Sequence, residues 1–193
     1  MKKKEFVIAE LVSYIIACIL GVIFHFVYSW SNQCFLIGLF FPVNESIWEH
    51  LKLVFFPIII VSLAEYYLFI RPQIAKHPSK SQPDIICIKL KSALIGMSFI
   101  VILFYTIHGI LGKTPDYVNI IIYFISMAIA YLYSCTHIKN GSNACNTGIL
   151  QAAGLFDSSK KCLICFFMIT IIFMIFTVCP PNLPLFFPNA INP

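Results

Sequence analysis

The chain has 193 residues, of which 60% are hydrophobic and only 11% are charged. A soluble globular protein carries about 25% charged residues, so this composition excludes a water-exposed fold of this size. The net charge of +5 comes with no basic patch interleaved with aromatic residues, which argues against a nucleic-acid partner.

Five apolar segments are long enough to cross a bilayer as helices, which takes about 20 mostly apolar residues. They cover residues 6–29, 48–70, 92–111, 117–135 and 162–178. The first is too long for a cleavable signal peptide, and no A-x-A site follows it. The sequence therefore predicts an all-α, polytopic transmembrane helix bundle with five spans, forming a single integral membrane domain over residues 1–193.

The positions of the basic residues predict an orientation. Eleven of the 13 Lys and Arg residues precede the first span or lie in the second or fourth connection: Lys2, Lys3, Lys4, Arg71, Lys76, Lys80, Lys89, Lys91, Lys139, Lys160 and Lys161. Cytoplasmic loops carry an excess of such residues. We therefore expect the N-terminus inside and the C-terminus outside.

Two segments on the predicted outer side cannot form spans. Residues 34–43 are apolar but too short, which predicts an interfacial or re-entrant segment. The tail, residues 179–193, is rich in proline, which prevents a regular helix, so we expect it to be extended and to lie over the outer surface. Cys34 and Cys179 are both predicted outside, and the sequence leaves open whether they form a disulfide.

Most of the eight cysteines lie in apolar runs or on the predicted cytoplasmic side, where thiols stay reduced. Cys162 and Cys165 form a C-x-x-C motif inside the fifth span. A thiol oxidoreductase needs an accessible thiolate, usually at a helix N-terminus, so a structural interpretation of this motif is favoured.

The densest polar segment is PVNESIWEHLK, which begins at position 42. Ser46-x-x-Glu49 matches a capping box and predicts a helix start. At about 100° per residue, Glu45, Glu49 and Lys52 are expected on one helix face, with His50 pointing away from it. Two carboxylates one turn apart repel each other unless a cation, a shared proton or Lys52 compensates them.

Polar residues also recur at helical spacing in other spans. The first span carries Glu10, Tyr14, Cys18, Gly21, His25 and Tyr28, the third Lys91, Ser98, Tyr105 and His108, and the fourth Asn119, Tyr123, Ser126, Ala130 and Tyr133. We infer that the first four helices surround a polar interior and that the fifth is a lipid-facing brace. Glu10 and Glu65 are expected to pair with Lys89 or Lys91.

Imidazoles and carboxylates are expected together near the outer face. The candidate metal ligands are His25, Glu49, His50 and His108, donor types that suit zinc or another divalent metal. The candidate catalytic acid–base groups are Glu45, Glu49 and His50, with Glu45 activating water. The candidate pocket residues are His25, Tyr28, Lys52, Tyr105, His108, Asn119 and Tyr123. A proton-sharing His/Glu pocket and ordinary polar helix packing are the competing interpretations.

The chain resembles an uncharacterised family of small bacterial multi-span membrane proteins. The resemblance rests on Gly21-x-x-x-His25-Phe26-x-Tyr28-x-Trp30, on the segment from Pro42 to Lys52, and on Pro180-Pro-x-x-Pro-Leu-Phe186. It implies a multi-pass protein of the bacterial plasma membrane, with the lipid bilayer as its surroundings. It implies no activity.

Three functions are compatible with these patterns. The first is an intramembrane, metal-dependent hydrolase or transferase acting on a lipid-like substrate. The second is a transporter or binding component for a small solute, coupled to protons, with Glu45, Glu49 and Lys52 lining its path; five spans cannot form two equal inverted halves, which argues against it. The third is a non-catalytic membrane assembly partner. The sequence specifies neither the substrate nor the oligomeric state.

Overall fold

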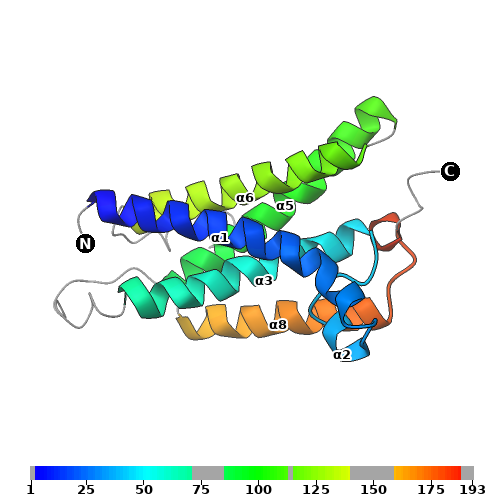
Figure 1. Cartoon of the computed structure of the whole chain (residues 1–193), viewed down its shortest axis with the longest axis horizontal. Coiled ribbons are helices and arrows are strands. Elements are labelled where there is room, and N and C mark those ends of the chain that lie inside the picture. The colour runs from blue at the N-terminus through cyan, green and yellow to red at the C-terminus, as the bar shows by residue number, and fades with distance from the viewer. Residues whose placement is uncertain (1–2, 71–84, 113–114, 140–158, 188–193) are drawn as a thin grey trace.

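The computed structural model describes residues 3–70, 85–112, 115–139 and 159–187, and these form helices and no strand (Figure 1). The long helices are α1 (Lys3–Trp30), α3 (Ile47–Glu65), α5 (Ile85–Leu111), α6 (Asp116–Lys139) and α8 (Ser159–Val178). The short elements are α2 (Phe35–Gly38), the π-helical turn η1 (Tyr66–Ile70) and the 3-10 turn η3 (Pro184–Phe186).

Each of the five long helices contains a stretch long and apolar enough to cross a membrane. This confirms the predicted all-α fold with five candidate spans. Large apolar side chains cover the outside of the bundle, including Ile8, Ile15 and Ile19 along α1, as expected where lipid replaces water. Which end of the bundle faces the cytoplasm stays a prediction.

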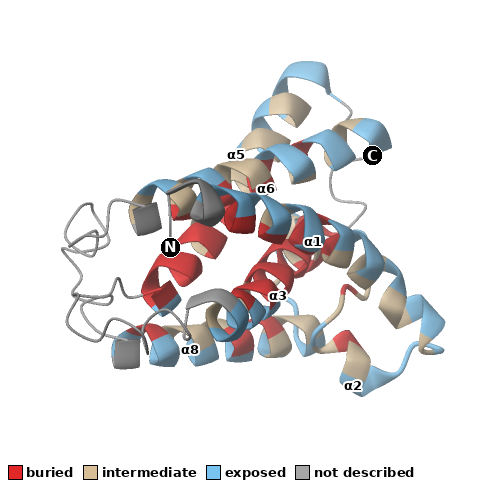
Figure 2. Ribbon diagram, turned by 60° about the vertical axis from the view of Figure 1, so that its left-hand side comes forward, coloured by how far each residue is buried: buried red, intermediate tan, exposed pale blue. Residues whose placement is uncertain are grey.

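Helix α3 is the centre of the bundle (Figure 2). In the most apolar stretch of α3, 61% of the residues are buried, whereas the corresponding stretches of the other four long helices are 33% buried or less. Val54, Phe55 and Ile58 have no exposed surface. A helix that is apolar on every side is stable only when neighbours surround it. In the apolar stretch of α8 only 11% of the residues are buried, in keeping with the expected lipid-facing brace.

Two glycines allow α1 and α5 to approach their neighbours closely. A Cβ added at Gly21 would collide with the Tyr123 hydroxyl and would lie 2.7 Å from the Leu53 carbonyl oxygen. A Cβ at Gly96 would lie 3.0 Å from Val54 Cγ1. Small residues at such crossings are what permits tight helix packing in a bilayer.

Helix α5 begins at Ile85, earlier than the predicted span, which began at residue 92. Lys89 and Lys91 were expected in a cytoplasmic loop, but they lie inside α5 and are buried. The reason is electrostatic: the Lys89 ammonium lies within 2.7 Å of carboxylate oxygens of both Glu10 and Glu65, so its charge is compensated inside the bundle. The predicted pairing of Glu10 and Glu65 with a lysine of this segment is confirmed.

The cysteine predictions need correction. Cys87 and Cys162 form a disulfide that joins α5 to α8, with their Cα atoms 5.3 Å apart, where reduced thiols were expected. Cys165, the second cysteine of the C-x-x-C motif, is free. Cys34 and Cys179 are free and exposed, so the disulfide left open by the sequence is not formed.

At one end of the bundle, which we call the pocket end, α5 and α6 run side by side and diverge from α1 and α3 (Figure 1). Helix α2 and the start of the tail lie at the same end. Phe186 of η3 is buried, with its ring centroid 4.9 Å from Trp48 and 5.4 Å from Phe176. The proline-rich tail therefore contains one 3-10 turn anchored on the bundle, and its last six residues lie outside the described part.

Candidate functional site

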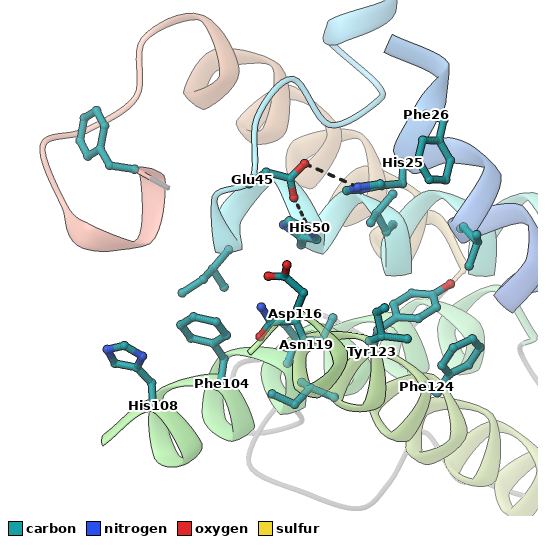
Figure 3. Close-up of a pocket in the computed structure, with 18 residues that line it drawn as sticks. His25, Phe26, Glu45, His50, Phe104, His108, Asp116, Asn119, Tyr123 and Phe124 are labelled. Carbon is teal, nitrogen blue, oxygen red and sulfur yellow. Dashed lines mark ion pairs between the residues drawn. The ribbon is translucent and has the colours of Figure 1, made fainter. Parts of the chain in front are cut away.

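A cavity of about 830 Å³ lies between α1, α3, α5 and α6 at the pocket end (Figure 3). Most of its wall is apolar. The polar residues that line it are His25, Glu45, His50, His108, Asp116, Asn119 and Tyr123. Phe187, the last described residue of the tail, also contributes to the wall.

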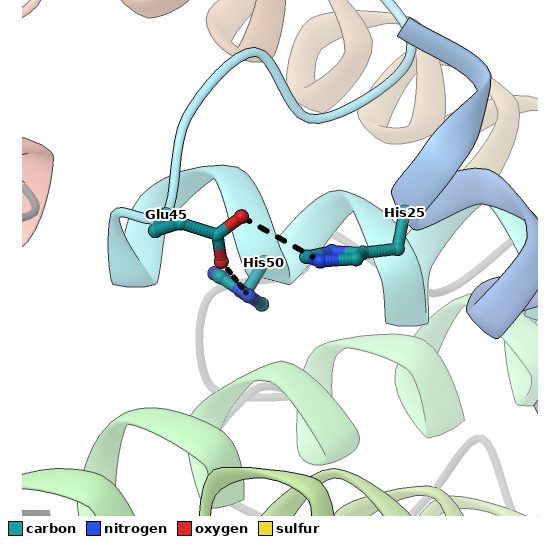
Figure 4. Close-up of side chains that lie close together, drawn as sticks. All are labelled: His25, Glu45 and His50. Carbon is teal, nitrogen blue, oxygen red and sulfur yellow. Dashed lines mark ion pairs between the residues drawn. The ribbon is translucent and has the colours of Figure 1, made fainter. Parts of the chain in front are cut away.

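Two histidines and one carboxylate converge on one side of this cavity (Figure 4). His25 comes from α1, His50 from α3, and Glu45 from the loop that precedes α3. His25 Nε2 lies 3.5 Å from Glu45 Oε1, and His50 Nε2 lies 3.3 Å from Glu45 Oε2. One ligand atom from each residue falls within 4.8 Å of the other two. We call these three residues the His25–Glu45–His50 triad.

The start of α3 places Glu45 in the triad. The Ser46 side chain caps the helix by accepting a hydrogen bond from Glu49 N–H at 3.3 Å. Residue 45 therefore lies before the helix and does not follow its periodicity. The prediction that Glu45, Glu49 and Lys52 share one face is wrong for this reason, and Glu45 instead meets His50.

Hydrogen bonding determines which nitrogen of His50 carries a proton. His50 Nδ1 lies 2.8 Å from the Ser46 carbonyl oxygen, which can only accept, so Nδ1 is the donor. In a neutral imidazole the lone pair then belongs to Nε2, the atom that faces Glu45 Oε2. A nitrogen lone pair and a carboxylate oxygen repel each other at 3.3 Å unless a proton or a cation lies between them.

Glu45 lies outside the helical spans and is 69% exposed. The hydrogen bond with His50 holds the pKa of the Glu45 carboxyl below its ordinary value, and the charges of His50 and His25 add to this effect. Partial burial of the carboxyl acts in the opposite direction. The carboxylate form of Glu45 is therefore the form that the site stabilises.

The opposite wall of the cavity belongs to α6. Figure 3 shows Asp116 and Asn119 facing the triad across the cavity. Among the described residues, the buried Asn119 Oδ1 has no hydrogen-bond partner, and the Tyr123 hydroxyl donates to the Cys18 carbonyl at 3.2 Å. Asp116 was not predicted as a site residue, because a carboxylate directly after Pro115 signals only the start of a helix.

Glu49 and Lys52 do not join the triad; they form a buried ion pair. Lys52 Nζ lies 2.7 Å from Glu49 Oε2 and 2.7 Å from Thr177 Oγ1, and it donates to the Gly38 carbonyl at 3.0 Å. Glu49 Oε2 also accepts from Val43 N–H at 3.0 Å. These contacts tie the segment after α2 and the end of α8 to α3, which gives the pair a structural role.

The remaining predicted residues occupy different places. His108 lines the cavity, but it lies beyond Phe104 and outside the triad, with the two rings stacked at 5.9 Å (Figure 3). Tyr28 packs against Gly38, and Tyr105 is 39% exposed on α5. Tyr28, Lys52 and Tyr105 are not among the described residues that line the cavity.

Five helices long and apolar enough to cross a membrane, with a partly polar cavity at one end, indicate a multi-pass helical membrane protein. Within that class, the chain belongs to the Family of unknown function (DUF6512), whose model matches residues 1–192. This membership agrees with the resemblance drawn from the sequence. No curated protein and no solved structure matches the chain.

Proposed function

We propose that the His25–Glu45–His50 triad binds a divalent transition metal, with zinc as the first choice. Two imidazoles and one carboxylate are a donor set of catalytic zinc sites, which keep a further position open. Ligand atoms about 2.1 Å from a tetrahedral metal lie about 3.4 Å from one another. Glu45 contacts each imidazole at a comparable distance through a different oxygen, Oε1 to His25 Nε2 at 3.5 Å and Oε2 to His50 Nε2 at 3.3 Å.

The orientation of His50 carries this proposal. A histidine that ligates a metal through Nε2 commonly donates its Nδ1–H to a backbone carbonyl, which sets the tautomer and the ring direction. The Ser46 carbonyl has this relation to His50. The ligand atoms of the triad lie within 4.8 Å of one another, so metal binding at tetrahedral spacing would draw side chains together by up to about 1.4 Å.

The cavity beside the triad favours an intramembrane hydrolase or transferase that acts on a lipid-like substrate. Its apolar wall suits an acyl chain, while the triad and α6 hold the polar groups that a headgroup or ester would meet. A metal at the triad would supply Lewis acidity. Asp116, on the facing wall, is available as a proton acceptor, and the Asn119 amide can hydrogen-bond a polar group of the substrate.

Metal analysis of purified protein tests the binding step. Protein purified in detergent without chelator and then loaded with zinc is expected to retain one equivalent after desalting. His25→Ala and His50→Ala should lose it. His108→Ala, which changes a cavity histidine outside the triad, is the matched control and should retain it. Wild-type protein that keeps no zinc, or equal retention in all three variants, would refute the proposal.

A turnover assay tests the catalytic step separately. Zinc-loaded protein in phospholipid vesicles is expected to release a lipid fragment, detected by mass spectrometry, and a chelator should stop the release. Asp116→Asn should slow it by a factor of about 10² to 10⁴, the usual contribution of a positioned acid or base. Bound zinc with no turnover on any lipid class would exclude the enzyme and favour the transport alternative.

A further inference from the structure

A second buried charge cluster lies at the end of the bundle opposite the cavity. Lys89 Nζ of α5 lies 2.7 Å from Glu10 Oε1 of α1 and 2.7 Å from Glu65 Oε2 of α3. Ser134 of α6 donates to Glu10 Oε1 at 3.1 Å. The side chains of Glu10, Glu65 and Lys89 are each 3% exposed or less. We call these three residues the Glu10–Lys89–Glu65 cluster.

The formal charges of this cluster do not balance. Two carboxylates and one ammonium leave one negative charge among buried side chains, where an uncompensated charge costs several kcal/mol. The Tyr131 ring, 5.1 Å from the ammonium, adds a cation–π contact but no charge. Compensation of the second carboxylate therefore has to come from a further group or from a bound ligand.

The other titratable groups near the cluster come from the same helices. Tyr14 and Cys18 lie on α1, and Tyr131 lies on α6 with its ring 5.7 Å from Tyr14. These three are neutral in their ordinary states. Lys91 is buried on α5 with an interaction of its own, and its Cβ leaves the helix about 200° round from that of Lys89.

Three unpartnered atoms point to a missing ligand. Among the described residues, Glu10 Oε2 and the Tyr131 hydroxyl are buried without a hydrogen-bond partner. Glu65 Oε2 is buried too and accepts no hydrogen bond, although it lies 2.7 Å from Lys89 Nζ. Buried polar atoms are almost always paired, so an orphaned carboxylate oxygen calls for a donor or a cation. A proton on Glu10 Oε2 removes the excess charge and makes that oxygen a donor.

We propose that the Glu10–Lys89–Glu65 cluster is a proton-binding site, with Glu10 as the main proton carrier. The step is a simple acid–base exchange: the Glu10 carboxyl releases one proton to water at this end of the bundle and takes one back. No electron transfer and no other reactant is involved. The site is distinct from the cavity, and the proposal does not depend on metal binding there.

Infrared spectroscopy of the whole protein in lipid nanodiscs tests this site. The carbonyl stretch of a buried protonated carboxyl group is expected near neutral pH, with an isotope shift in D₂O, and it should disappear as the pH rises. Glu10→Gln should abolish the band. Glu45→Gln, which changes an exposed carboxylate at the pocket end, is the control and should leave the band unchanged.

Charge-balance variants keep the test decisive if Glu10→Gln does not fold. Glu65→Gln leaves Glu10 alone with the Lys89 ammonium, so the titration midpoint of the band should fall by about 1–3 pH units. Lys89→Met removes the ammonium, so the midpoint should rise. Folding of each variant is checked by circular dichroism and size exclusion.

Three results would overturn the proposal. One is a wild-type protein without a titrating carboxyl band. Another is a midpoint that moves in neither charge-balance variant. The third is a band whose midpoint falls steadily as Na⁺ replaces another salt at constant ionic strength, because that result would identify the ligand as a metal cation.

Discussion

Replacing Lys52 by Met tests the buried ion pair that anchors the pocket end. The Lys52 side chain has no exposed surface, and its ammonium contacts Glu49 and Thr177 at 2.7 Å each. Removing one partner of a buried pair costs about 3–5 kcal/mol, because the other charge is left uncompensated. In the variant, Glu49 keeps the N–H of Val43 and the hydroxyl of Thr177 as donors, each at 3.0 Å. We therefore expect the loss in free energy of unfolding to lie at the lower end of this range, at about 3 kcal/mol.

A double-mutant cycle measures this energy directly. Lys52→Met, Glu49→Gln and the double variant are unfolded by a denaturing detergent in mixed micelles, with helicity as the signal. The double variant should lose less stability than the sum of the two singles, with a coupling energy of about 0.5–3 kcal/mol. Lys161→Met, at an exposed position of α8, is the control and should lose no more than about 1 kcal/mol, the upper value for an exposed charge.

Two results would contradict the assigned geometry. A loss below about 1 kcal/mol for Lys52→Met would be the value of a solvent-exposed pair. Strict additivity in the double variant would mean that the two side chains do not interact. Either result would mean that the Glu49–Lys52 ion pair does not hold the segment after α2 against α3.

Two further predictions concern the cavity. Gly21→Ala should destabilise the protein by about 1–3 kcal/mol in the same assay, because its Cβ overlaps the neighbouring helices. Gly109→Ala is the matched control, since a Cβ there meets nothing within 4 Å; equal effects of the two changes would refute the close approach of α1. The second concerns pH. Folding lowers the Glu45 pKa through protonated imidazoles, so with chelator present the stability difference between wild type and Glu45→Gln should be present above the ordinary pKa of 4.5 for as long as His50 carries its proton. It should vanish as the pH falls through the lower folded pKa of Glu45. The difference is expected to be small because Glu45 is largely exposed, and a difference that grows on acidification would refute the assigned contacts.

The sequence alone determined the features that depend on local composition. Apolar runs of spanning length predicted all five long helices, because a bilayer excludes unpaired backbone groups and leaves a helix as the stable form. The capping pattern at Ser46 predicted the start of α3. The cost of burying an isolated charge was enough to predict that Glu10 and Glu65 would take a lysine partner.

The tertiary structure alone decided which polar groups meet. Glu45 reaches His25 only because the α1–α3 connection turns back to the same end, and it reaches His50 only because the helix begins after it. Asp116 belongs to the cavity because α6 forms the wall that faces the triad, and this contact joins residues far apart in the chain. Helical periodicity gives the direction of a side chain relative to its own axis, whereas contacts between elements depend on how the helices pack. Packing at the pocket end is set by close approaches such as that at Gly21, which no local pattern specifies.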